Sequence, residues 1–206
     1  MSTGRREPSM TVSRAPEDAD VAAAQRGDVR AFERLFRTVQ PSLLRYLGSL
    51  VGHDAADVAS ETWLQVTRDL SSFRGGGDDF KGWVVTIGRH RALDHLRSMR
   101  RRPSDPLDPA AMPARAAPDD TFDATEEALA TRRALDLISR LPQDQAEAVL
   151  LRIVVGLDSP ATAKILGKRS GAVRMATSRG LTRLQELIAE ESDVTLPAPL
   201  ALEELR

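Results

Sequence analysis

Two carboxylates at a helical spacing are the first candidates for chemistry in this chain of 206 residues. Asp57 and Glu61 lie four positions apart, so a helix would carry both on one face. A carboxylate pair can act in general acid–base catalysis, dock on a basic partner or face solvent. The chain contains no Cys and the surrounding sequence implies no pocket, which favours docking or solvent exposure. We therefore expect no catalytic residues.

The three histidines are the next candidates, as metal ligands. His90 and His95 are five positions apart, a poor spacing for one helix face, and His53 precedes a separate helix. The lack of Cys excludes thiolate metal sites and disulfide bonds. We expect neither a metal nor a cofactor.

Basic side chains are the third candidates, and they favour a polyanion as partner. Residues 81–102 hold seven Lys and Arg against Asp94 alone, and residues 128–189 hold ten against five acids. Between these blocks, residues 103–127 hold seven acids against Arg115. Although the formal net charge is −1, two basic blocks separated by an acidic segment indicate two surfaces for one nucleic acid. Solvated helix faces are the alternative interpretation.

The elements that must position these residues are predicted to be helices. Apolar residues recur at helical spacing in both halves and strand signals are almost absent, which indicates an all-α protein with two small helical domains. Five prolines between 103 and 120 predict a flexible acidic linker, because proline breaks helices. The expected parts are an N-terminal tail (1–16), a first domain (17–102), the linker (103–127), a second domain (128–191) and a C-terminal tail (192–206).

Helix breakers and caps divide the first domain. Pro41 interrupts a helical pattern and predicts a kink or the start of a new helix. A further helix is expected over 54–70, with Asp54 as its N-cap. Residues 75–79 are expected to form a loop, followed by a long helix over 80–101.

That loop and the arginine-rich helix after it form a candidate nucleic-acid site. A flexible loop ahead of a basic helix can present a pocket and a phosphate track together, as proteins that hold single-stranded bases do. A long solvent loop is the alternative. Phe80 and Trp83 are expected in the core rather than stacked on bases.

The second domain has the pattern of a helix-turn-helix. Ser159 is expected to cap a short helix that has Pro160 at its first position, and Gly167 forms a turn before a longer helix over 170–188. In such motifs the first helix braces the second, which enters the major groove. The expected apolar face of the second helix comprises Val173, Thr177, Leu181, Leu184 and Ile188. The candidate groove contacts are Arg169, Ser170, Arg174, Met175, Ser178 and Arg179.

These motifs, in this order, resemble those of one protein family. The first half closely resembles region 2 of bacterial sigma-70-type transcription initiation factors, on DVASETWL at 57–64, SFRG at 72–75 and FKGWVVTIGRHRALDHLR at 80–97. The second half resembles region 4, on LP at 141–142, VLL at 149–151, GL at 156–157, AKILG at 163–167, SGAVR at 170–174 and RGL at 179–181. The resemblance covers roughly 20–190 and is to the extracytoplasmic-function (ECF) group, which keeps only these two regions.

The resemblance implies a promoter-specificity subunit that binds core RNA polymerase and has no enzymatic activity of its own. Asp57 and Glu61 would dock on the clamp helices of the largest polymerase subunit. Helix 170–183 would recognise the −35 element, and the acidic linker would thread the polymerase near its active-site cleft. The residues that would bind the −10 element, with the loop capturing a flipped base, are Phe73, Arg74, Gly75, Gly76, Asp78, Asp79, Lys81, Arg89, His90 and Arg97. An anti-sigma protein is an expected further partner.

Two other functions remain open on the residues alone. A stand-alone helix-turn-helix repressor or activator would explain residues 128–189, and an enzyme would use Asp57 and Glu61. No apolar run is long enough to span a bilayer, and the N-terminus does not resemble a secretory signal, so we expect a cytoplasmic protein.

Overall fold

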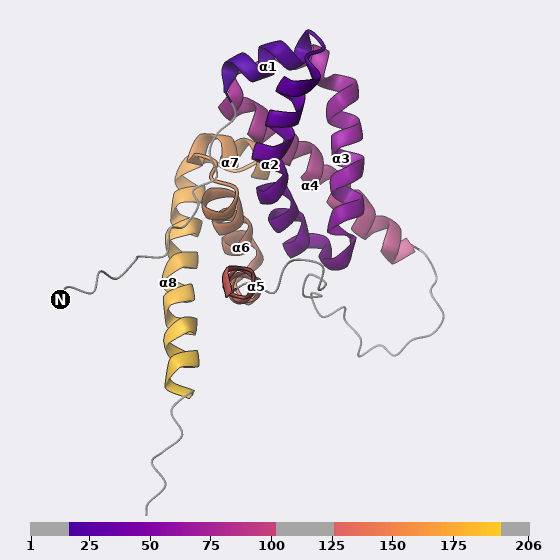
Figure 1. Ribbon diagram of the computed structural model, residues 1–206. Coiled ribbons are helices and arrows are strands. Elements are labelled where there is room, and N and C mark those ends of the chain that lie inside the picture. The colour runs from indigo at the N-terminus through magenta and orange to yellow at the C-terminus, as the bar shows by residue number, and fades with distance from the viewer. Residues whose placement is uncertain (1–16, 102–125, 195–206) are drawn as a thin grey trace, which may run out of the picture.

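The computed structural model describes residues 17–101 and 126–194 (Figure 1). The expected N-terminal tail (1–16), Arg102, residues 103–125 of the expected linker and residues 195–206 of the expected C-terminal tail lie outside these ranges. Every regular element within the described ranges is helical, which confirms the all-α prediction.

The two halves contribute separate sets of helices. The first half comprises α1 (Asp18–Gln25), α2 (Val29–Val51), α3 (Ala55–Asp69) and α4 (Gly77–Arg101), with short 3₁₀ turns at Gly52–Asp54 and Leu70–Ser72. The second half comprises α5 (Glu126–Ser139), α6 (Gln143–Val149), a π-helical turn (Leu150–Val154), α7 (Ser159–Leu166) and α8 (Ser170–Val194).

Pro41 starts no new helix, because α2 continues through it. Leu35 and Val39 before the proline and Leu43 and Leu47 after it are all fully buried on one face. The proline removes one backbone hydrogen bond, but the packing of this continuous apolar stripe favours a single helix.

Several helix ends differ from the sequence expectation. Asp54 does occupy the N-cap position of α3, but its side chain makes no capping bond. Asp158, not Ser159, caps α7, and its carboxylate accepts a hydrogen bond from the Ala161 amide at 2.7 Å. Helix α4 begins at Gly77 rather than Phe80, so the last part of the expected loop is its first turn.

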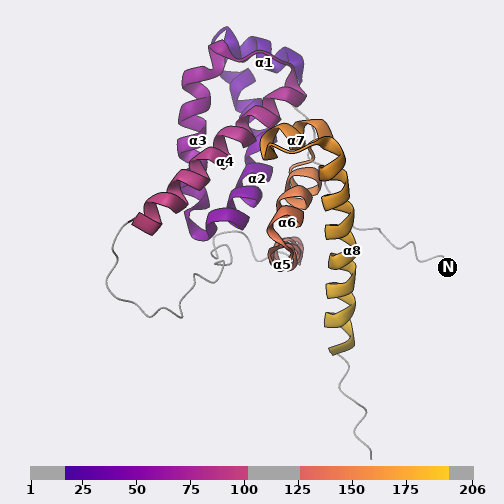
Figure 2. The same ribbon diagram turned by 180° about the vertical axis from the view of Figure 1, so that it is seen from behind.

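The halves pack against each other and share a core. Helix α7 lies beside α4, and the π-helical turn contacts α2 (Figures 1 and 2). Fully buried side chains come from both halves, among them Leu43 and Phe80 from the first and Leu150 and Leu151 from the second. Helix α8 packs along α6 and extends past it, where α5 contacts it.

Candidate nucleic-acid and polymerase interfaces

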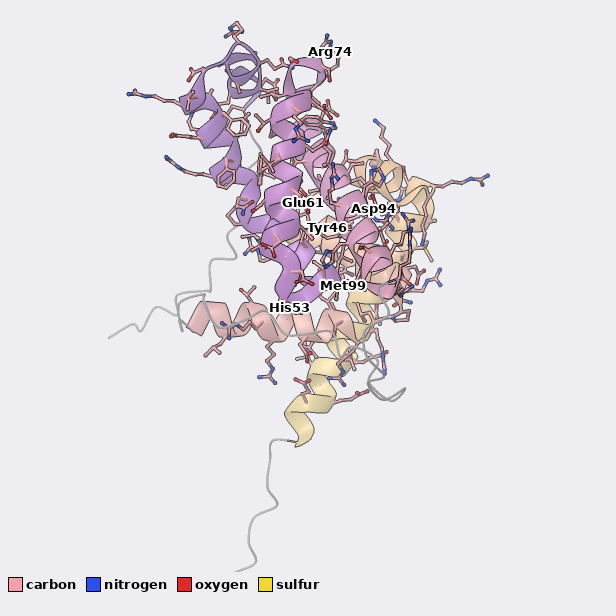
Figure 3. All side chains as sticks on the ribbon, turned by 90° about the vertical axis from the view of Figure 1, so that its right-hand side faces the viewer. Tyr46, His53, Glu61, Arg74, Asp94 and Met99 are labelled. Atoms are coloured by element: carbon pink, nitrogen blue, oxygen red, sulfur yellow. The ribbon has the colours of Figure 1, made fainter. Side chains whose placement is uncertain are left out.

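Helix α3 carries the expected docking face. Asp57 and Glu61 are both exposed, and Leu64, one turn further along the same face, is 59% exposed. The opposite face, with Val58 and Val66, is buried against α2 and α4. Figure 3 shows Glu61 on the side of α3 that faces outward. An exposed apolar side chain beside two carboxylates is suited to a basic protein partner.

The helix-turn-helix is formed as expected by α7, a turn and α8. Gly167 has φ +62°, a left-handed conformation that glycine adopts without strain and that ends α7. Gly180 allows a close approach of α8 to α6, because a Cβ there would lie 2.7 Å from the Val149 side chain. These two glycines fix the angle and the distance at which α8 leaves the motif.

The structure brings all six candidate −35 residues to one end of α8. Arg169, Arg174, Met175, Ser178 and Arg179 are exposed, and Ser170 is half-buried at the first helical position. Behind them, Val173 and Thr177 are buried as expected.

The apolar face of α8 is partly different from the expected one. Leu181 and Ile188 are 39% and 51% exposed, whereas Leu187 is only 4% exposed. A step of four residues turns 400° around a helix of 3.6 residues per turn, which is 40° more than one full turn. Repeated steps of four therefore place the later expected residues progressively further from the buried side of α8. The buried stripe instead follows Val173, Ala176, Gly180 and Leu187.

The loop residues expected at the −10 element divide into an inward and an outward group. Phe73 is only 8% exposed, stacks on Trp83 with ring centroids 4.8 Å apart and meets Phe80 edge-on at 5.7 Å. Its ring therefore belongs to the aromatic core, and so does Phe80, as expected. Arg74 is exposed at the far end of the first half from Met99 (Figure 3).

The outward group also contains the rest of the loop and the first turn of α4. Gly75, Asp78 and Asp79 are exposed, and Gly76 is half-buried. The Gly76 amide points at the Asp79 carboxylate, at 3.4 Å. A nucleotide could reach this backbone from solvent.

The basic side chains of α4 are only partly accessible. His90 and Arg97 are exposed, and Arg97 pairs with Asp94 at 2.8 Å. Lys81 is only 3% exposed and lies near the backbone of Gly156 in the second half. Burial lowers the pKa of the Lys81 amine, and the charge of Arg45 acts in the same direction while that of Asp78 opposes it.

Arg89 pairs with Glu147, which was not among the candidate residues predicted from the sequence. Its guanidinium donates to the carboxylate of Glu147 at 3.1 Å, and both side chains are mostly buried. The Tyr46 hydroxyl is buried at the same junction, where the charges of Arg89 and Glu147 both act on it. Burial raises the pKa of this phenol. The sequence signal for Glu147 was its position between two alanines, directly before the apolar run 148–151.

Two arginines extend the exposed basic face beyond the expected residues. Arg100 and Arg101 form the last turn of α4 and are exposed next to Arg97. Their place in the basic run was the sequence signal. Arg91 has a structural role instead, because it donates to the Gln65 side chain at 2.8 Å.

The histidines do not come together as a ligand set. His95 contacts one carboxylate oxygen of Asp54 at 2.8 Å and His53 contacts the other at 3.3 Å, while His90 is exposed elsewhere on α4. Within residues 17–101 and 126–194, no group of three or more His, Asp and Glu side chains has an arrangement that could hold a metal ion. No helix in the same ranges is long and apolar enough to cross a membrane.

Comparisons with known proteins relate both halves to one family. The model for Sigma-70 region 2 matches residues 35–102, and that for Sigma-70, region 4 matches residues 131–184. The ECF RNA polymerase sigma factor BldN of Streptomyces coelicolor is 34% identical over 178 residues, which are 84% of this chain and 66% of that protein. The ECF RNA polymerase sigma factor SigD of Mycobacterium tuberculosis is 34% identical over 194 residues, which are 90% of each chain.

A solved structure has a similar fold. The sigma factor RpoE of Bartonella quintana, crystallised with the anti-sigma factor NepR, has a TM-score of 0.61 to this chain and 25% sequence identity. The match covers 78% of this chain and 98% of that one.

Proposed function

The chain belongs to the ECF group of sigma-70 family RNA polymerase sigma factors, and we propose that it binds core RNA polymerase and directs promoter-specific transcription initiation. The observation that carries this proposal is the pairing of two DNA-suited surfaces in one chain. One is the exposed end of α8 in the second half, and the other is the loop and basic helix of the first half.

Recognition of the −35 element is assigned to the N-terminal part of α8. Arg174 and Arg179 can donate to guanine edges or phosphates, and Ser170 and Ser178 can hold phosphates. The buried side of α8 fixes the orientation of these side chains against α6.

Melting of the −10 element is assigned to the loop before α4 and to α4 itself. Extruding a base from a duplex costs a few kcal/mol, so a loop that holds the extruded base favours the melted state. His90, Arg97 and Arg100 would follow the sugar–phosphate backbone of the open strand.

This assignment requires the two halves to separate. Lys81 and Arg89 lie on the helix that would face −10 DNA, yet Gly156 and Glu147 of the second half are against them. DNA therefore gains access to these two residues only when α6 and α7 leave α4. We infer that the described packing belongs to the free chain and that binding to polymerase favours the separated state.

Polymerase docking is assigned to the face of α3 that carries Asp57, Glu61 and Leu64. Its acidic groups complement basic residues on a partner, and the clamp helices of the largest subunit are the partner that the family implies. An anti-sigma protein that competes for these surfaces is a further expected partner, since the Bartonella relative was crystallised with one.

The relatives are sigma factors by name, and we propose that this chain likewise has no catalytic activity of its own. Its site of action would be the cytoplasm, where core polymerase and chromosomal DNA are found.

Run-off transcription tests the proposal. Purified core polymerase is incubated with a promoter library, with and without the full-length chain, and transcripts are sequenced. Initiation from a shared two-element motif that depends on the chain is the expected result. No initiation, together with tight polymerase-independent binding to a duplex site, would instead support a stand-alone repressor or activator.

A further inference from the structure

Helix α1 contacts the loop before α4 through one stripe of its surface. Asp18, Val21 and Gln25 lie three and four positions apart, so two turns of α1 place them on one face. Val21 is 2% exposed and anchors the stripe in the core. The two polar residues flank it, and both bond to backbone groups of the segment 70–77.

Gln25 holds the start of this segment. Its side-chain amide donates to the Leu70 carbonyl at 3.0 Å and to the Phe73 carbonyl at 2.8 Å. These carbonyls belong to the 3₁₀ turn after α3 and to the residue at which the loop begins. Both N–H donors of the Gln25 side chain therefore bond to the backbone of this segment.

Asp18 holds the end of the segment. Its carboxylate accepts a hydrogen bond from the Gly77 amide at 2.7 Å, and Gly77 is the first residue of α4. A Cβ at Gly76 would lie 2.5 Å from the same oxygen, so this contact requires glycine at position 76. The carboxylate thus supplies from α1 a capping bond for α4.

Bonds within the loop come from the Arg74 guanidinium, which donates to the Ser71 and Phe73 carbonyls, and from the Gly76 amide, which donates to Asp79. Gly75 has φ +145°, and a Cβ there would lie 2.6 Å from the Cβ of Asp79. Glycine loses more conformational freedom on folding than any other residue, so the bonds from α1 add to those within the loop in offsetting this cost. A loop held in one conformation before binding also gives up less entropy when it takes up a nucleotide.

We propose that Asp18 and Gln25 are positioning residues for −10 melting, and that α1 braces both ends of the loop that receives the unpaired base. This inference rests on the proposed function for the identity of the ligand. It goes beyond that function because it assigns a role to α1, which carries none of the DNA-contacting residues assigned above.

The chain offers matched variants for a test. Asp18→Ala removes the acceptor for the Gly77 amide, whereas Asp18→Asn keeps an oxygen at the same place and should restore the bond. Gln25→Met keeps the length of the side chain and removes both donors. Asp20→Asn is the control, because Asp20 lies on the same helix but pairs with Arg34 of α2 at 2.6 Å and leaves the loop untouched.

The first measurement is amide hydrogen exchange in the free, full-length chain, read on peptides that span 70–80. Asp18→Ala and Gln25→Met should raise exchange over 73–78 while peptides within α3 and the remainder of α4 stay unchanged. Asp18→Asn and Asp20→Asn should resemble the wild type. Unchanged exchange over 73–78 in both Asp18→Ala and Gln25→Met would overturn the proposal.

The second measurement is run-off transcription by reconstituted holoenzyme on a promoter selected with the wild type. One template is fully duplex, and the other carries a mismatched, already open −10 segment. Asp18→Ala and Gln25→Met should each lose roughly five- to tenfold on the duplex template, as expected for one or two hydrogen bonds, and about twofold or less on the open one. Equal losses on both templates would indicate a merely structural role and overturn the proposal.

The two measurements separate this inference from the proposed function. If the wild type initiates from no promoter, the proposed function fails, and hydrogen exchange still decides whether α1 holds the loop. If the wild type initiates and Asp18→Ala matches it on the duplex template, the positioning role fails alone.

Discussion

Arg89 of α4 and Glu147 of α6 form an ion pair, 3.1 Å between nitrogen and oxygen, that joins the two halves across 58 positions of the chain. Their side chains are only 20% and 11% exposed. The pair places a carboxylate against an arginine that DNA phosphates would otherwise contact. Under the proposed −10 assignment, Glu147 would occupy the place of a phosphate in the packed state.

Glu147→Gln tests whether this pair holds the halves together. The amide keeps the size of the side chain but loses the charge that compensates Arg89. Hydrogen bonds to charged groups contribute about 1.5–3 kcal/mol, so unfolding in denaturant should show a loss of about that size. Fluorescence energy transfer between labels on α3 and α8 should report a larger average separation.

Glu33→Gln is the control for that change. Glu33 pairs with Arg37 on the surface of α2, where both side chains are at least half exposed. Exposed pairs of this spacing contribute about 0.3–0.5 kcal/mol. Equal losses in the two variants would show that the Arg89–Glu147 pair has no special role in the interface.

Arg174→Ala tests the recognition surface on α8. If Arg174 reaches a base edge, the change should weaken holoenzyme binding by about 1–3 kcal/mol and relax the sequence preference at one −35 position. The measurement is binding to a set of single-base variants of the selected promoter. Arg183→Ala is the control on the same helix, since Arg183 pairs with Glu186 further along α8. An equal loss on every sequence would show that Arg174 contacts only phosphate.

Reversal of charge on α3 tests the docking surface. Asp57→Lys and Glu61→Lys should each weaken binding to core polymerase by roughly tenfold or more, because like charges placed together across an interface cost several kcal/mol. Both side chains are exposed, so thermal unfolding should change little. Glu33→Lys, on α2, is the control. Normal polymerase binding by both α3 variants would refute the assignment.

The helices were largely predictable from the sequence because apolar spacing, prolines and glycines act locally. Local rules were wrong where distant packing competes with them. Pro41 does not divide α2, since a continuous buried stripe crosses it. Asp54 does not cap α3 with its side chain, because its carboxylate contacts His95 of α4 instead.

The candidate sites were predictable as residue types but not in their accessibility. A run of basic residues marks α4, yet nothing local indicates that Lys81 and Arg89 lie against the second half. Likewise, the loop motif marks Phe73, but its ring packs on Trp83. These outcomes depend on contacts between residues far apart in the chain, which spacing rules do not describe.

The burial of Lys81 predicts a pH dependence of stability. Its pKa is lowered in the folded chain, whereas an unfolded lysine titrates near pH 10.4. Between the lowered pKa and about 10.4 the unfolded state binds more protons, so this group makes the free energy of unfolding rise with pH over that window.

Lys81→Met isolates this contribution, since methionine fills a similar space without a titrating group. Denaturant unfolding of both proteins should be measured at intervals from about pH 7.5 to 10. This range lies below the ordinary pKa of lysine, where the unfolded state holds the Lys81 proton more firmly than the folded state does. The wild type should gain stability relative to Lys81→Met as the pH rises, and Tyr46, whose pKa is raised, affects both proteins alike. A constant difference between the two curves would show that Lys81 keeps its ordinary pKa, which would mean that the second half does not cover it in solution.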